Sequence, residues 1–120
     1  MGEFKTKLQV ESQGQYWELI SPLIFDSNIY GEITVPAGFF TDFASVPRIP
    51  IVYAMFGNKS HSSAALHDYL YSGSEDISRK DADNIFLEAM ESRNQSKWCR
   101  KVMWRAVRWF GGGRYVSFKR

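Results

Sequence analysis

The spacing of apolar residues changes once along this chain, and that change limits the folds it can adopt. In residues 1–35, β-branched and aromatic residues are frequent, and apolar and polar side chains alternate between Phe4 and Val10. Beyond residue 60, apolar residues recur every three or four positions, which indicates helices. Strands that come first and helices that come after predict an α+β fold.

Three strands are predicted in the first part of the chain, over residues 4–10, 16–24 and 29–35. Turn residues separate them at Gln13-Gly14 and at Asp26-Ser27-Asn28. Residues 36–50 contain prolines and a glycine, which interrupt helices and strands, so an ordered loop is predicted there. Residues 114–118 can form a last strand. We expect a small N-terminal antiparallel sheet of three to four strands.

About three helices are predicted between residues 60 and 111, packed against the sheet. They are expected over residues 64–71, from the N-cap Ser78 to about residue 91, and from near Ser96 to the glycines at 111–113. Asp81 follows Ser78 by three residues, an arrangement in which the carboxylate also complements the helix dipole. The first of these helices follows His61-Ser62-Ser63 and is expected to end at Gly73.

Length and composition predict one domain over residues 1–120. The chain has 120 residues, of which 44% are hydrophobic, which is enough to build a core without disulfide bonds. Its single cysteine, Cys99, cannot form an intrachain disulfide, and this is typical of a reducing compartment. The first ten residues lack the apolar run of a secretory signal, and no stretch is long enough for a transmembrane segment.

The charge is distributed unevenly along the chain. Residues 1–90 contain 6 Lys and Arg against 12 Asp and Glu, a net charge of −6, whereas residues 91–120 contain 9 against 1, a net charge of +8. The basic residues of the last predicted helix alternate with aromatic ones, and the candidate binding surface comprises Lys97, Arg100, Lys101, Trp104, Arg105 and Arg108. Four interpretations remain open: contact with anionic lipid, with nucleic acid, with another protein, or core packing with a solvated basic rim.

A candidate catalytic group lies on the first two predicted helices. His67 and Tyr71 are four residues apart and share one helix face. Asp83 falls on the apolar stripe of the next helix, where a carboxylate is costly unless it is paired. The imidazole of His67 and the hydroxyl of Tyr71 are its nearest expected partners. An aspartate on one nitrogen of His67 would leave the other to act as a general base.

Two further carboxylates are candidate metal ligands. Asp68 is turned about 100° away from His67 on the helix and could bind a divalent cation such as calcium. Asp42, in the predicted loop, could be a second ligand, or it could only stabilise a turn with Thr41 and Ser45. The common zinc, serine-hydrolase and phosphate-loop motifs are absent, which excludes most enzyme classes that have a short signature.

Three segments of the sequence together resemble a known family. They are Gly38 to Pro47, Ala64 to Tyr71, and Arg79 with Ala82-Asp83 and Phe86 to Met90. Their order and spacing resemble those of the phage and prophage family catalogued as domain of unknown function 1353. The resemblance implies a bacteriophage or prophage origin, and therefore a location in the host bacterial cytoplasm or in the virion.

A second, local resemblance is to phospholipase A2. His67-Asp68-Tyr69-Leu70-Tyr71 is similar to the His-Asp-x-x-Tyr helix of that family, and Asp83 to the aspartate of its following helix. This resemblance implies that His67 is the base, Asp68 a calcium ligand, and Tyr71 with Asp83 the supports of the histidine. The glycine-rich calcium loop of phospholipase A2 is absent, so Thr41-Asp42 would have to replace it.

Two functions are therefore predicted side by side. In one, the chain is a small phage hydrolase with a site centred on His67, assisted by a metal ion. In the other, it is a non-enzymatic phage protein, either a virion component or a modulator that binds a host protein. In the second case the same polar residues form a buried network that holds residues 36–50 against the helices.

Overall fold

The strands come first in the chain and the helices follow, so the predicted α+β class is confirmed. The computed structural model describes residues 2–41 and 50–117, and it describes the side chains of these residues except 50–60 and 110. Within this part of the chain, six short strands form two antiparallel sheets of three strands each. Three α-helices and one short 3₁₀ helix complete the fold.

The first sheet has the strand order β1-β4-β5 and supplies most of the β contribution to the core. It consists of β1 (Glu3–Phe4), β4 (Leu23–Ser27) and β5 (Gly31–Val35). Phe25 of β4 lies opposite Ile33 of β5, and both side chains are buried. Alternate residues on both strands are buried, which is the pattern of a sheet with one face against helices.

The second sheet has the order β2-β3-β6 and is more exposed. It consists of β2 (Val10–Gln13), β3 (Tyr16–Leu19) and β6 (Phe40–Thr41). The turn predicted at Gln13-Gly14 joins β2 to β3, and Gly14 has a φ of 69°, which glycine adopts without steric cost. Strand β6 lies inside the segment predicted to be a loop, and residues 42–49 of that segment lie outside the described residues.

The strand boundaries differ from the predicted ones because side chains and a proline interrupt the backbone pairing. The predicted strand 4–10 is divided, since the hydroxyl of Thr6 accepts from the N–H of Ile24 (3.0 Å) and donates to the carbonyl of Pro22 (3.1 Å). Pro22, which has no N–H, also separates β3 from β4 within the predicted strand 16–24.

The second predicted turn lies at residues 28–30 rather than at 26–28. The hydroxyl of Ser27 accepts from the N–H groups of Ile29 (3.0 Å) and Tyr30 (3.2 Å). These two bonds stabilise a turn that begins after Ser27, so Ser27 itself remains the last residue of β4. The same hydroxyl donates to the carboxylate of Glu88 at 2.6 Å. Glu88 belongs to the second helix, so this turn also attaches the first sheet to the helices.

The three helices are α1 (Pro50–Tyr71), α2 (Arg79–Ser92) and α3 (Lys97–Phe110). The predicted caps of α2 and α3 are confirmed, because Ser78 accepts from the N–H of Asp81 and Ser96 from that of Cys99. The predicted start of the first helix is wrong, since α1 already begins at Pro50. Proline suits the first position of a helix, where an N–H would have no partner within the helix. The sequence did not predict helix through residues 50–63 because Gly57 and Asn58 have low helix propensity.

The predicted last strand is also wrong over the described residues. Gly112–Arg114 forms a 3₁₀ helix, and residues 115–117 are not part of a sheet. The N–H of Val116 donates instead to the carbonyl of Tyr71 at 2.8 Å. The C-terminal segment thus satisfies a carbonyl at the end of α1, where the helix itself leaves acceptors without partners.

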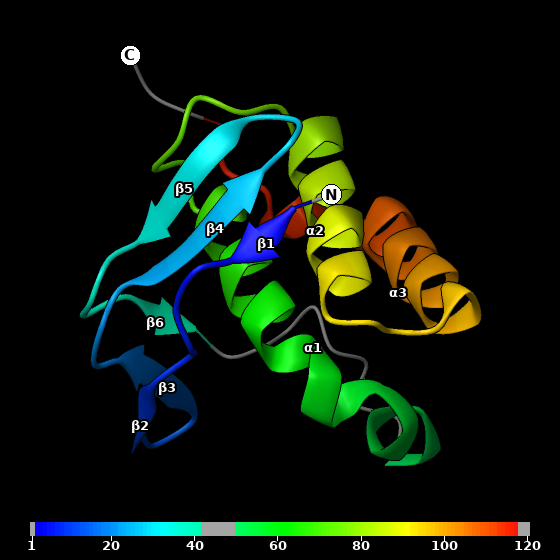
Figure 1. The fold of residues 1–120 in the computed structure, drawn as a ribbon, viewed down its shortest axis with the longest axis horizontal. Helices are drawn as coiled ribbons and strands as arrows, with labels where there is room; N and C mark the ends of the chain where they lie inside the picture. Colours follow the sequence, from blue (N-terminus) through cyan, green and yellow to red (C-terminus); the bar gives the residue numbers. More distant parts are fainter. Residues whose placement is uncertain (1, 42–49, 118–120) are drawn as a thin grey trace.

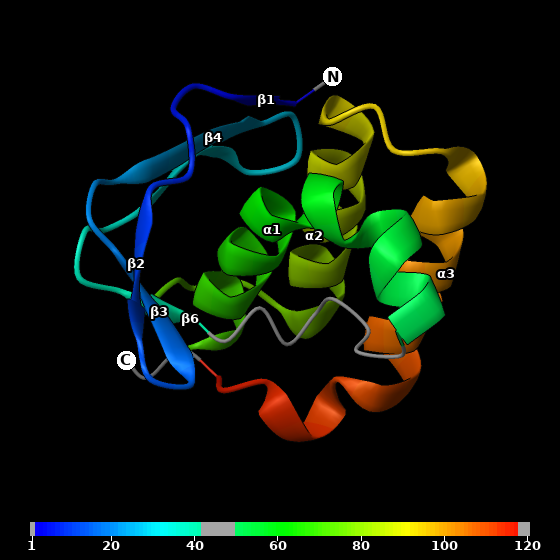
Figure 2. The same ribbon diagram turned by 90° about the horizontal axis from the view of Figure 1, so that it is seen from below.

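The elements form layers (Figure 1). Seen from below, α2 and the later turns of α1 lie between the strands and α3 (Figure 2), which agrees with the contacts of α2 with both β4 and α3. The core between these layers is apolar, with Phe25, Leu66, Leu70 and Phe86 fully buried. The polar side chains of His67, Tyr71 and Asp83 are buried in this interior as well.

A glycine at the end of α1 tests how closely the C-terminal segment packs. Gly73 has a φ of 82°, and an added Cβ would lie 3.0 Å from Val116 Cγ1. We expect Gly73→Ala to lower the free energy of unfolding by about 1–2 kcal/mol through its left-handed backbone, and by more than that because the added Cβ crowds Val116. The control is Gly38→Ala, which has a φ of 90° but no atom within 4 Å of the added Cβ. Equal urea midpoints for the two variants would contradict the packing.

Candidate functional site

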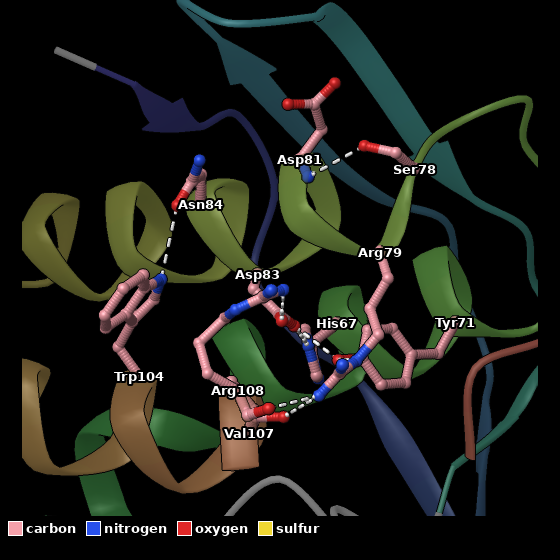
Figure 3. A network of polar contacts seen from close by, with 10 residues as sticks. All are labelled: His67, Tyr71, Ser78, Arg79, Asp81, Asp83, Asn84, Trp104, Val107 and Arg108. Atoms are coloured by element: carbon pink, nitrogen blue, oxygen red, sulfur yellow. Dashed lines mark hydrogen bonds and ion pairs between the residues drawn. The ribbon is translucent and has the colours of Figure 1, made fainter. Parts of the chain in front are cut away.

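The three helices each contribute to one group of polar side chains around a buried carboxylate. Helix α1 provides His67 and Tyr71, which are one turn apart, α2 provides Asp83, and α3 provides Arg108 (Figure 3). The predicted apolar stripe of α2 explains the place of Asp83, since Ile85, Phe86 and Met90 of this helix are also fully buried. We call His67, Tyr71, Asp83 and Arg108 the Asp83 network.

The carboxylate of Asp83 is the centre of this network. Its Oδ1 lies 2.7 Å from Nε2 of His67 and accepts from the hydroxyl of Tyr71 at 2.5 Å. Its Oδ2 accepts from the guanidinium of Arg108 at 2.7 Å. Asp83 has an exposed fraction of 0%, so these donors replace the water that an aspartate normally binds. The predicted grouping of His67, Tyr71 and Asp83 is thus present, with a cation added to it.

Burial decides which of these groups carry charge. It lowers the pKa of His67 below the ordinary 6.5, and the nearby Arg114 and Arg79 act in the same direction, although the bond to Asp83 opposes the shift. Burial would raise the pKa of Asp83, but hydrogen bonds from His67, Tyr71 and Arg108 outweigh it and hold the pKa below 3.8. Around neutral pH, a neutral His67 therefore donates from Nε2 to an ionised Asp83, and Arg108 balances the charge.

Arg79 links the network to the end of α3. Its Nε donates to the hydroxyl oxygen of Tyr71 at 3.3 Å. Its Nη2 donates to the carbonyls of Val107 (2.8 Å) and Arg108 (2.5 Å), which belong to the last turn of α3. A cation at this position satisfies acceptors at the helix C-terminus and complements its dipole. Tyr71 is accordingly held on both sides, by Asp83 and by Arg79.

A surface pocket lies next to the network and shares Tyr71 with it. It has a volume of about 270 Å³ and is formed by β3, the β6 region, the end of α1 and the C-terminal segment. Its walls include Tyr16, Phe39, Phe40, Asp68, Tyr71 and Arg114. His67 is not among the described residues that line this pocket. We call it the aromatic pocket.

The candidate metal ligand Asp68 is not a member of the Asp83 network. Asp68 accepts a hydrogen bond from the hydroxyl of Thr41 and faces the aromatic pocket. Asp42 lies outside the described residues. Within the residues the structure does describe, no three His, Cys, Asp or Glu side chains come together as a metal site. The calcium site therefore stays a prediction.

The residues of the predicted binding surface divide into two groups. Three of them face α2: Arg100 pairs with Glu91 at 3.1 Å, Trp104 donates to Asn84 at 3.2 Å, and Arg108 joins Asp83. Lys97, Lys101 and Arg105 are exposed on the outer side of α3. Over the described residues, every helix is too short or too polar to cross a bilayer.

Sequence reasoning missed the contributions of Arg79 and Arg108 to the site. Arg108 was assigned to the binding surface, yet one signal pointed elsewhere. A buried Asp83 with only His67 and Tyr71 as partners would leave a negative charge without compensation, because burial keeps an imidazole neutral. Such a carboxylate requires a cation, and the basic third helix was the nearest source of one.

The family described as "Protein of unknown function (DUF1353)" matches residues 17–107, from β3 almost to the end of α3. The chain belongs to this family. No curated protein and no solved structure matches it. The DUF1353 match includes both helices that provide His67, Tyr71 and Asp83, and all of α3 except its last three residues.

The protonation of His67 makes the stability of this DUF1353 protein depend on pH. In the unfolded chain His67 binds a proton below about pH 6.5, whereas the folded protein resists that proton because the pKa is lowered. We expect the free energy of unfolding to fall by up to about 1.4 kcal/mol per pH unit below pH 6.5. Asp83, with its lowered pKa, adds a loss only below about pH 3.8.

The measurement is urea unfolding between about pH 7 and pH 5, done in a His61→Gln background because burial lowers the pKa of His61 as well. Adding His67→Gln should abolish the slope, since glutamine can still donate to Asp83 but does not titrate. An unchanged slope in the double variant would show that His67 is not the titrating group.

Proposed function

We propose that this chain is a non-enzymatic phage or prophage protein that acts by binding a partner protein, and that the Asp83 network is structural. The observation that supports this most is that the described donors to one fully buried carboxylate come from two other helices, α1 and α3. A group with this role connects the helices and needs no access to a substrate. The origin rests on the family resemblance.

The surroundings of His67 support a structural role. Its ring packs against those of Tyr71 and Phe86, with centroids 4.0 Å and 4.6 Å away, and its exposed fraction is 2%. A general base has to come within hydrogen-bonding reach of its substrate or of a water molecule. The aromatic pocket instead presents the ring of Tyr71 and the carboxylate of Asp68 to a ligand.

The rim of the aromatic pocket supports a binding role. Tyr16 and Phe40 are 44% and 54% exposed there, and Trp17 and Ile20 of the same region are also exposed. Aromatic residues are enriched at protein interfaces, where they often anchor binding. We propose that this surface binds either a virion protein or a host protein in the bacterial cytoplasm.

A small hydrolase remains the second candidate, because His67 and Asp83 are 2.7 Å apart and Asp68 lies one residue away in the wall of a pocket. In this proposal His67 is the base, Tyr71 and Asp83 orient it, and Asp68 with Asp42 binds a divalent cation such as calcium. The substrate would have to reach the nitrogen of His67 that does not face Asp83.

The structural role predicts that His67→Ala lowers the free energy of unfolding by about 3 kcal/mol, because it leaves a cavity and removes a donor from a buried carboxylate. His67→Gln, which can still donate to Asp83, should keep most of the stability. Both values come from urea unfolding followed by circular dichroism. A His67→Ala variant as stable as the wild type would contradict the structural role.

The same variants separate the hydrolase from the binding protein. Wild type and His67→Gln are titrated with calcium and assayed on phospholipid and peptidoglycan. We expect no hydrolysis by either protein. Calcium-dependent hydrolysis by the wild type, lost in a His67→Gln variant of unchanged stability, would replace the proposed function by the second candidate.

The binding role predicts that Phe40→Ser removes a partner that co-purifies with the wild type from infected cells or virions, because it removes an exposed aromatic anchor. Ile29→Ser is the matched control, since Ile29 is 53% exposed but lies beside the first sheet. The partner is quantified by mass spectrometry in each preparation. Equal recovery with both variants would show that the aromatic pocket is not the binding surface.

A further inference from the structure

The outer side of α3 combines exposed aromatic and basic side chains. Lys97, Lys101 and Arg105 follow one another at intervals of four residues and are all exposed. Trp98 and Trp109 are 60% and 74% exposed, near the two ends of the helix. We call these five residues the basic face of α3. None of these five residues belongs to the Asp83 network or lines the aromatic pocket.

Helix geometry places the basic face on one side. At 3.6 residues per turn, the five side chains fall within an arc of about 120°, and the two tryptophans differ by only about 20° around the axis. Along the axis the tryptophans are about 16 Å apart. Met103 and Val107, on the opposite side, are buried against the rest of the protein. Both indoles can therefore touch a single flat surface at the same time.

The charge of this region is strongly positive. Helix α3 contains no acidic residue, and Glu91, the one acidic residue among residues 91–120, pairs with Arg100 away from the basic face. Residues 1–90 carry a net charge of −6. An anionic surface would attract α3 and repel most of the remaining chain, so the protein would approach it with α3 foremost.

We infer that the basic face of α3 binds the surface of an anionic phospholipid membrane. Tryptophan favours the level of the lipid headgroups, and lysine and arginine next to it bind acidic lipids. A single-stranded nucleic acid is a less suitable ligand, because it requires a basic groove with aromatic rings close enough for successive bases. Here the cations lie on a convex helix, and the indoles stand far apart on it.

Sedimentation with vesicles tests this binding. Phosphatidylcholine vesicles with and without phosphatidylglycerol are compared, using the full chain. We expect binding only when phosphatidylglycerol is present, and weaker binding as salt is added. The double variants Lys101→Glu/Arg105→Glu and Trp98→Ser/Trp109→Ser should each reduce the partition coefficient about tenfold or more. Both pairs are exposed, so thermal unfolding should stay as in the wild type.

The matched control is Lys5→Glu/Lys7→Glu, which reverses the same number of exposed positive charges near β1. It should bind the vesicles as the wild type does. If both charge-reversal variants lost the same amount of binding, net charge alone would explain the binding, and the inference would be overturned. Unchanged binding of the Trp98→Ser/Trp109→Ser variant would overturn it as well. A single-stranded oligonucleotide is added as a competitor. If it displaced the vesicles and bound the same residues more tightly, the basic face of α3 would be a nucleic-acid-binding surface instead.

Discussion

The fold depends on how one buried carboxylate is kept charged. An aspartate without access to water is stable only if donors surround it, and Asp83 obtains them from α1 and α3 while itself belonging to α2. Moving any of the three helices would remove a donor from this charge. The apolar core stabilises many arrangements of three helices, but the Asp83 network favours one of them.

The Asp83 network fixes the position of one residue in the wall of the aromatic pocket. Tyr71 donates to Asp83 and accepts from Arg79, so the ring that forms one wall of the pocket has a fixed position. The carbonyl of Tyr71 also accepts from the N–H of Val116, which brings the C-terminal segment into the wall of the pocket. The Asp83 network and the aromatic pocket thus share one tyrosine. A substitution at His67 could therefore alter the pocket through Tyr71, although His67 is not among the described residues that line it.

Local signals in the sequence predicted the parts of the structure that are determined locally. The caps at Ser78 and Ser96 and the proximity of His67 to Asp83 follow from short patterns and from the cost of burying a charge. The division of the strands into two sheets could not be predicted, because it depends on the side chain of Thr6 bonding a strand eighteen residues away. The contact of Arg108 with Asp83 could not be predicted, because the sequence of a basic helix does not distinguish an exposed arginine from one that turns inward.

The most direct test of the central role of Asp83 is a double-mutant cycle between α2 and α3, with Asp83→Asn, Arg108→Met and the double variant measured by urea unfolding. If the buried carboxylate and the partly exposed Arg108 side chain stabilise each other, the coupling free energy should be about 1–3 kcal/mol. The double variant should then be less destabilised than the sum of the effects of the two single variants predicts. Coupling below about 0.5 kcal/mol would mean that the two side chains act independently, and it would contradict the account.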